Sequence, residues 1–166
     1  MDTLWSPWRY DYIKNSGPGG RTDPNFCIFC DLPTAPGTDA EKYILLRASF
    51  NYVVLNIFPY ISGHLMIVPF EHLADLDAAP KATTDELMDL TKRAQTVLRE
   101  VYHPQGFNLG MNLGAAAGAG VAGHFHQHVM PRWFGDANFM TTVGETRVIS
   151  EDLSTTYEKL QAGFVA

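Results

Sequence analysis

Three of the chain's six histidines alternate with other residues in one short stretch, GHFHQHVMPRW. Side chains along a β-strand point to opposite faces at successive positions, so a strand here places His124, His126 and His128 on one face. Phe125 and Val129 then lie on the other face. The pattern predicts a strand with one apolar side that other elements must cover and one histidine-lined side.

Three uses of this histidine face are open. It can be a solvated polar face, a metal cluster, since neutral imidazole is a common ligand, or a nucleophilic histidine with neighbours that orient it and hold an anion. The preceding loop, GAAAGAGVAG, favours anion binding, because glycine lets backbone N–H groups approach a ligand closely. Gly118 and Gly120 are its candidate phosphate contacts. With Gly123 they match the dinucleotide pattern G-x-G-x-x-G, but that pattern opens a helix and this one opens a strand, so we reject the match.

Short apolar runs and one long amphipathic run organise the rest of the chain. Runs rich in branched and aromatic residues predict strands, and apolar residues at helical spacing predict a long helix that Pro104 and Gly106 end. Strands are expected at 43–48, 51–58, 64–70, 106–114 and 124–133, and helices at 71–76, 84–102 and 150–163. The order of strands, helix, strands and helix favours an α+β fold with a mainly antiparallel sheet.

Local signals set the expected ends of these elements. Thr83 and Glu86 form a capping-box pattern at the start of the long helix, and His103, before a proline, is expected to cap its end. Residues 1–15 are expected to form an aromatic arm or helical turn. Neither a repeat nor a linker divides the 166 residues, which predicts one domain over 1–166.

Composition excludes several classes of protein. The net charge of −6 argues against a general nucleic-acid or anionic-membrane binder, which would carry a basic patch. The sequence contains no run of about 18 apolar residues, so no membrane span is predicted. The N-terminus lacks the apolar core of a signal peptide. A cytoplasmic location is therefore expected. Cys27 and Cys30 are the only cysteines, and in a reducing compartment such a C-x-x-C pair is more often a metal or redox pair than a structural disulfide.

The stretch HFHQHVM resembles the signature of the histidine triad family, in which three histidines alternate with apolar residues. Gln127 departs from the apolar pattern at one position. The resemblance extends to LNIFPYISGHLMIVP (55–69), which is similar to the family's nucleotide-binding strand, turn and strand. LWSPWRYDYI (4–13) and PRWFGDANFM (131–140) resemble the bacterial branch related to fragile-histidine-triad proteins and diadenosine tetraphosphate phosphorylases.

The resemblance implies an α+β homodimer that cleaves a dinucleoside polyphosphate, such as diadenosine tetraphosphate, through a nucleotidyl-histidine intermediate. His126 would attack the α-phosphorus, and His128 would donate to a phosphate oxygen or the leaving group. By the same resemblance Asn56 would hold the ribose hydroxyls, and Asn112 would contact a phosphate or the leaving group. Water or phosphate would then release the nucleotide.

The resemblance also suggests a zinc site. Some histidine triad proteins, and related hexose-1-phosphate uridylyltransferases, bind one zinc ion through two cysteines, a downstream histidine and the first histidine of the triad. The matching residues here are Cys27, Cys30, His72 and His124. A closed site of four ligands is structural rather than catalytic. The alternative is a pair of reduced thiols without metal.

Other functions remain open beside polyphosphate cleavage. The chain could hydrolyse nucleoside phosphoramidates or adenylyl conjugates, could bind nucleotides without catalysis, or could use all three histidines around a catalytic metal. His64 is expected near the site in a structural role. Arg132 is expected either to neutralise a distal phosphate or to pair with an acid.

Overall fold

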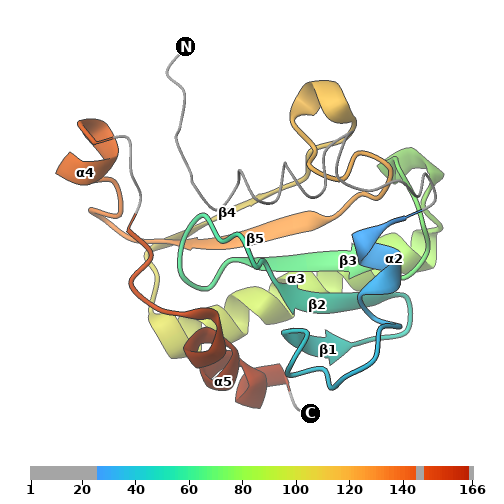
Figure 1. Cartoon of the computed structure of the whole chain (residues 1–166), viewed down its shortest axis with the longest axis horizontal. Coiled ribbons are helices and arrows are strands. Elements are labelled where there is room, and N and C mark those ends of the chain that lie inside the picture. The colour runs from blue at the N-terminus through green and yellow to red at the C-terminus, as the bar shows by residue number, and fades with distance from the viewer. Residues whose placement is uncertain (1–25, 145–147, 165–166) are drawn as a thin grey trace.

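The computed structural model of the chain describes residues 26–144 and 148–164, so the expected arm at 1–15 lies outside the described residues. Five strands form one sheet in the order β1-β2-β3-β5-β4 (Figure 1). They are β1 (Ile44–Arg47), β2 (Asn51–Leu55), β3 (Leu65–Pro69), β4 (Gly106–Gly110) and β5 (Gln127–Arg132). Every neighbouring pair is antiparallel, which confirms the predicted α+β fold.

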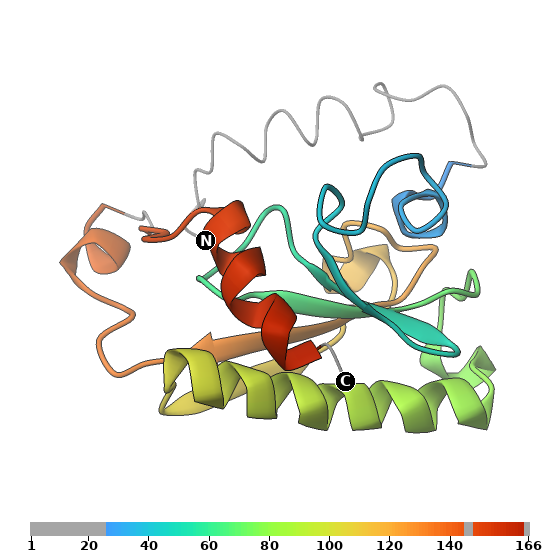
Figure 2. The same cartoon turned by 90° about the horizontal axis from the view of Figure 1, so that it is seen from below.

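Two long helices lie against one face of this sheet. They are α3 (Lys81–Tyr102), which runs along the sheet, and α5 (Leu153–Phe164), which crosses beside it (Figure 2). The other face carries the short helix α2 (Ile28–Asp31) and the glycine-rich loop with its 3-10 turn η2 (Ala115–Ala117). Short turns at η1 (Leu76–Ala78) and α4 (Phe139–Thr142) complete the described elements. Within the described ranges, no helix is long and apolar enough to cross a membrane.

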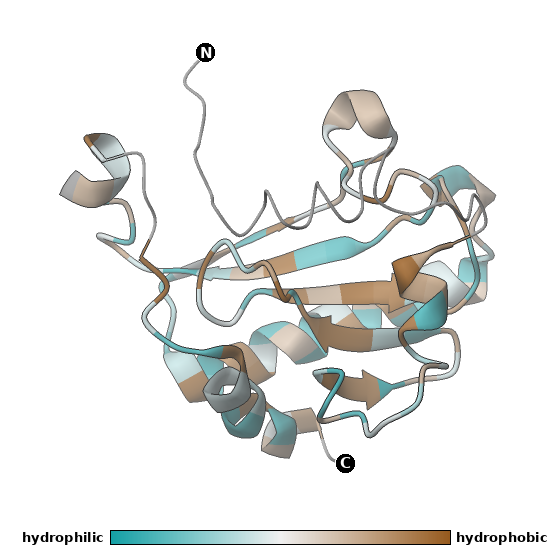
Figure 3. Cartoon of the chain, in the orientation of Figure 1, coloured by the Kyte–Doolittle hydropathy of each residue, from teal (hydrophilic) through white to brown (hydrophobic). Residues whose placement is uncertain are grey.

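The central strands divide their side chains between two cores. Val53, Leu55 and Val129 belong to the larger core, which α3 and α5 close. Tyr52 and Val54 belong to a smaller core beside α2. All of β2 and β3 is buried, and apart from Asn51 at the start of β2 both strands are continuously apolar rather than alternating. Figure 3 shows this contrast, with hydrophobic β2 and β3 beside a β5 that contains a hydrophilic stretch.

The start of α3 differs from its prediction. The helix begins at Lys81, directly after Pro80, rather than at 84, and Thr83 does not cap it. The Glu86 carboxylate, at 2.8–2.9 Å, instead accepts hydrogen bonds from the backbone N–H groups of Ser49, Phe50 and Asn51. The capping-box interpretation is therefore wrong, because this carboxylate satisfies the donors of the β1–β2 turn and not those of its own helix.

Other element ends follow local hydrogen bonding. His103 ends α3 in the left-handed conformation, with φ 48°, which confirms its predicted capping position. Helix α5 begins at Leu153 rather than 150, because the Asp152 carboxylate accepts from the Thr155 N–H at 2.8 Å. The helix expected at 71–76 is wrong. That segment is irregular up to η1, and the Leu73 carbonyl accepts from the Phe125 N–H at 2.7 Å.

Candidate active site and metal centre

The histidine stretch folds with its side chains sorted as the sequence predicted. Strand β5 begins only at Gln127, yet His124, His126 and His128 all lie on the α2 side of the sheet and Phe125 lies in the core on the α3 side. All three imidazoles are buried, with exposed fractions of 0%, 6% and 7%, which excludes a solvated polar face. Gln127 is accommodated on the apolar side because its amide donates to the Thr91 hydroxyl of α3 at 2.9 Å.

The protonation of His126 follows from its partner. Its Nδ1 lies 3.1 Å from the carbonyl oxygen of His124. A carbonyl can only accept, so Nδ1 carries the proton and Nε2 of the neutral ring carries a lone pair. The Phe29 ring, between the two cysteines in sequence, packs on this imidazole with a centroid separation of 4.6 Å. His126 is thereby oriented with a nucleophilic nitrogen available.

The opposite tautomer follows for His128 from a chain of three groups. The backbone N–H of Tyr60 donates to Nδ1 of His64 at 3.1 Å. Neutral His64 therefore carries its proton on Nε2, which donates to Nδ1 of His128 at 2.9 Å. Neutral His128 must then carry its own proton on Nε2. The Tyr60 ring stacks beside both imidazoles.

Burial keeps these imidazoles uncharged near neutral pH. Burial, followed by the neighbouring histidines, lowers the pKa of His64 to about 3. Burial, and then His126, lowers the pKa of His128 to about 4. Burial also lowers the pKa of His126, although the hydrogen bond to the His124 carbonyl opposes this shift. The pair His126 and His128 therefore offers one lone pair and one N–H donor with rings 4.9 Å apart.

The two candidate asparagines lie at the ends of strands beside the histidines. Asn56 follows β2, is buried, and accepts from the Phe58 N–H through its side-chain oxygen at 3.0 Å. Its amide nitrogen lies 3.4 Å from Nδ1 of His64. The register of β4 and β5 pairs Gly110 with His128, and Asn112 follows two residues later, toward His126. Their contacts with a nucleotide remain predictions.

The glycine-rich loop uses some of its donors internally. Gly118 adopts φ 87°, a conformation that favours glycine, and its N–H donates to the Ala115 carbonyl at 3.0 Å. Gly120 is exposed a few residues before His124. The element that follows these glycines is strand β5 and not a helix, in agreement with the rejection of a dinucleotide fingerprint. Phosphate contacts by Gly118 and Gly120 remain predictions.

Arg132, at the end of β5, pairs with an acid. Its guanidinium donates to both carboxylate oxygens of Asp136, at 2.5 and 2.7 Å, and also to the side-chain oxygen of Asn108. The Asp136 carboxylate raises the pKa of this guanidinium. Of the two roles expected for Arg132, the structure supports acid pairing.

The four predicted metal ligands come together beside His126. These residues are Cys27, Cys30, His72 and His124. Their ligand atoms all lie within 4.8 Å of one another. Nδ1 of His124 lies 3.3 Å from Sγ of Cys27 and 3.4 Å from Sγ of Cys30. Zinc bond lengths of about 2.3 Å to sulfur and 2.0 Å to nitrogen give sulfur–nitrogen separations of about 3.5 Å in a tetrahedron. The cluster therefore has the dimensions of a four-ligand metal site.

The surroundings of the cluster also suit a metal. The second nitrogen of His124, Nε2, donates to the Pro69 carbonyl at 2.9 Å and so directs Nδ1 toward the thiols. Burial, followed by the Cys27 thiol, raises the pKa of Cys30 to about 11. Because only thiolates ligate metals, binding a cation here releases protons.

Sequence reasoning missed two aromatic contacts of this site. Phe29 packs on His124 and His126, and Tyr60 stacks on His128 and donates its backbone N–H to His64. Phe29 carried a usable signal, because a large apolar residue between two clustered ligands must pack against that cluster. Tyr60 carried none, since its role depends on how the β2–β3 turn folds back.

Comparisons with known proteins agree with this geometry. The model of the HIT domain matches residues 38–135. The chain is 38% identical over 161 residues to AP-4-A phosphorylase of Mycobacterium tuberculosis, covering 94% of this chain and 80% of that protein. It is 29% identical over 90 residues to the asymmetrical bis(5'-nucleosyl)-tetraphosphatase of Schizosaccharomyces pombe, covering 54% of this chain and 48% of that protein.

A solved structure of a histidine triad protein has a similar fold. A zinc-bound histidine triad family protein from Mycobacterium smegmatis superposes with a TM-score of 0.67 at 28% identity, covering 83% of this chain and 92% of that one. The HIT domain match spans more than half of the chain, and it contains the glycine-rich loop and all three alternating histidines. The chain therefore belongs to the HIT domain family.

Proposed function

We propose that this chain is a nucleotidyl hydrolase or transferase that cleaves dinucleoside polyphosphates, such as diadenosine tetraphosphate, through a nucleotidyl-histidine intermediate on His126. The observation that carries the proposal is the pair of opposite tautomers, with a lone pair on Nε2 of His126 and a proton on Nε2 of His128. The names of two relatives, a phosphorylase and a tetraphosphatase, support the substrate class.

The first step forms the intermediate. Nε2 of His126 attacks the α-phosphorus, and the bond from that phosphorus to the bridging oxygen breaks. The leaving oxygen takes the electron pair and leaves as a phosphate anion, and the N–H at Nε2 of His128 donates a hydrogen bond to it. The His126 ring becomes positively charged, and the His124 carbonyl, 3.1 Å from Nδ1, stabilises that charge.

The second step releases the nucleotide. Water or inorganic phosphate attacks the same phosphorus, the phosphorus–nitrogen bond breaks, and Nε2 of His126 regains its lone pair. The proton of the attacking group stays on the product phosphate or passes to solvent. Diadenosine tetraphosphate yields ATP in the first step, and then AMP with water or ADP with phosphate.

The binding residues follow from the resemblance and from position. Asn56, at the end of β2, would contact the ribose hydroxyls, and Asn112 would contact a phosphate or the leaving group. Gly118 and Gly120 belong to the glycine-rich loop, whose backbone N–H groups would stabilise charge on the phosphoryl oxygens. Preorganised donors of this kind stabilise the charge that develops in the transition state, and this is usually the largest single contribution to lowering the barrier.

We further propose that Cys27, Cys30, His72 and His124 bind one structural zinc ion. The separations of their ligand atoms and the zinc-bound relative support this choice of metal. When bound, zinc would cross-link α2 to the histidine strand and would leave His126 and His128 free for chemistry. Both cysteines are free thiols in the structure, which fits a reducing, cytoplasmic location.

A homodimer is also part of the proposal. Strand β4 is an edge strand of the sheet, and Leu109 on it is 45% exposed. An open edge with an exposed apolar side chain can be covered by a second copy of the chain. The negative net charge gives no support to a nucleic-acid partner.

The first test is incubation with diadenosine tetraphosphate, with and without inorganic phosphate, followed by separation of products. AMP and ATP formed without phosphate identify a hydrolase, and ADP and ATP formed only with phosphate identify a phosphorylase. The absence of any product would contradict the proposal. It would favour phosphoramidate hydrolysis through the same histidine, or nucleotide binding without catalysis.

A further inference from the structure

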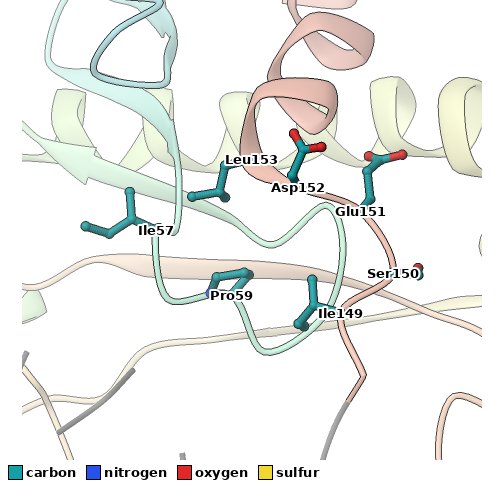
Figure 4. A pocket seen from close by; sticks show the side chains of 7 residues that line it. All are labelled: Ile57, Pro59, Ile149, Ser150, Glu151, Asp152 and Leu153. Carbon is teal, nitrogen blue, oxygen red and sulfur yellow. The ribbon is translucent and has the colours of Figure 1, made fainter. Parts of the chain in front are cut away.

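The ring of Phe29, on the one-turn helix α2, contacts the proposed nucleophile. Its centroid lies 4.6 Å from that of the His126 imidazole, with an angle of 47° between the two ring planes. The side chain is buried, with 6% exposed. It does not line the cavity of about 520 Å³ between the β2–β3 turn and the segment 149–153 (Figure 4). We therefore look for the function of this ring in its contacts inside the protein.

Neighbouring groups fix the position of the Phe29 ring. The hydroxyl of buried Tyr52 donates to the Phe29 carbonyl at 2.9 Å. The Cys30 N–H donates to the Cys27 carbonyl at 3.0 Å and so closes the turn that carries the ring. The side chain packs in the smaller core beside α2. Moving the ring away from His126 would break this packing, so the contact is a fixed feature of the site.

The proposed reaction places a positive charge on a buried imidazole. When Nε2 of His126 bonds to phosphorus and Nδ1 keeps its proton, the ring becomes a cation. A buried charge costs free energy unless other groups compensate it. The His124 carbonyl, 3.1 Å from Nδ1, compensates part of this charge. Within residues 26–144 and 148–164, no carboxylate forms an ion pair with His126.

We infer that Phe29 stabilises the positive charge of the nucleotidyl-histidine intermediate through a cation–π interaction with the His126 ring. A cation is attracted to an aromatic ring when it lies within about 6 Å of the ring centroid, and the attraction is stronger where water is excluded. The separation of 4.6 Å and the burial of both side chains meet these conditions. Because the attraction grows as the charge develops, it lowers the barrier and does more than tighten substrate binding.

The inference rests on the proposed function, because only a covalent bond to His126 creates this charge. The test replaces Phe29 by 4-fluoro-, 3,5-difluoro- and 3,4,5-trifluorophenylalanine. Fluorine withdraws electron density from the ring and weakens its attraction for a cation step by step, while the shape of the side chain is nearly kept. Phe125 receives the same series as the matched control, because it is buried beside His126 in sequence but lies in the larger core.

Two rates are measured with diadenosine tetraphosphate labelled at the α-phosphorus, at saturating enzyme and with inorganic phosphate present. Rapid quenching follows the release of ATP, which reports formation of the adduct, and the loss of label from the protein, which reports its decay. Calorimetry measures AMP binding to each variant. Thermal unfolding checks that each variant is folded.

We expect the release of ATP to slow with each fluorine added to Phe29, by about tenfold for the trifluoro derivative, which is a change of about 1.4 kcal/mol in the barrier. The adduct should decay faster along the same series, because its charge is less stabilised. Simple misplacement of His126 would instead slow both steps. The Phe125 series should leave both rates unchanged, and AMP affinity should stay constant in all variants.

ATP release that stays constant along the Phe29 series overturns the inference, and so does an adduct decay that slows in parallel with ATP release. An equal trend at Phe125 overturns it too, since the effect would then belong to the core. A change confined to AMP affinity would assign Phe29 to ligand binding instead. Wild-type protein that takes up no label and releases no ATP contradicts the proposed function itself.

Discussion

His126 and His128 lie two residues apart on one face, yet they present opposite chemistry. Their spacing was readable in the sequence, and so was the shared face. Their tautomers were not, because each depends on an acceptor or donor from elsewhere in the fold. The His124 carbonyl orders the proton of His126, and His64 orders that of His128. His64 was expected near the site, but its direct contact with His128 depends on how the β2–β3 turn folds.

At this scale the first prediction concerns the nucleophile. His126→Ala removes the nitrogen that bonds to phosphorus, so turnover of diadenosine tetraphosphate should fall by roughly 10³-fold or more. AMP binding should change far less, because the other contacts remain. Product release assays and calorimetry on the same preparation measure both. Retained turnover would remove His126 from the reaction.

Acid sensitivity of the fold gives a second prediction. The pKa of His64 is lowered to about 3 and that of His128 to about 4 by burial, against about 6.5 in an unfolded chain. Between these values the unfolded state binds more protons, so the free energy of unfolding should decrease as the pH falls from about 6.5 toward 4. Above pH 6.5 the two histidines should contribute no pH dependence.

The measurement is urea unfolding of the wild type and of His64→Asn across pH 4 to 7. The variant starts less stable, because it loses the hydrogen bond to His128. Its stability should nevertheless fall less steeply below pH 6.5. Since both proteins keep the same carboxylates and the same metal ligands, those contributions cancel in the comparison. Equal slopes would show that His64 titrates normally in the folded chain.

At the scale of elements, periodicity located the strands and helices, while their ends depended on tertiary contacts. The apolar face of α3 was predicted from spacing, but Glu86 was assigned to the wrong partner. A local motif cannot reveal that a carboxylate will meet a turn 35 residues earlier. The same limit applies to 71–76, where pairing of the Leu73 carbonyl with Phe125 overrides a local helical pattern.

The third prediction follows from that carboxylate. Glu86→Ala leaves the backbone donors of Ser49, Phe50 and Asn51 without their acceptor, so the free energy of unfolding should fall by roughly 1–3 kcal/mol. The matched control is Glu100→Ala, on an exposed position of the same helix, which should change stability by less than about 0.5 kcal/mol. Denaturant unfolding of both variants decides this, and equal effects would argue against the role given to Glu86.

Across the whole molecule, the metal cluster joins parts of the chain that lie far apart in sequence. Cys27 and His124 are 97 residues apart, and their ligand atoms are separated by 3.3 Å. Only the resemblance to the histidine triad family could predict this set, because four ligands on three segments have no spacing rule of their own. The cavity beside α5 had no comparable signal, since it exists only where two distant segments meet.

The fourth prediction tests this link. Treating the protein with a strong zinc chelator, or replacing Cys30 by serine, should lower the melting temperature by several degrees or more, because a closed metal site stabilises the folded state. Thr96→Ser, at an exposed position of α3, is a neutral control. Elemental analysis should find about one zinc per chain in the wild type and far less in the cysteine variant. A melting temperature indifferent to both treatments would argue against a structural metal.

His124 serves two purposes with two different parts of itself. Its side chain belongs to the metal cluster, while its main-chain carbonyl orders the proton on His126. Every amino acid has that carbonyl, so selection on the chemistry does not constrain the side chain at this position. Related chains could therefore replace the metal ligands by apolar side chains, a few at a time, and keep the nucleophile His126. The metal cluster is thus expected to vary more among relatives than the nucleophile does.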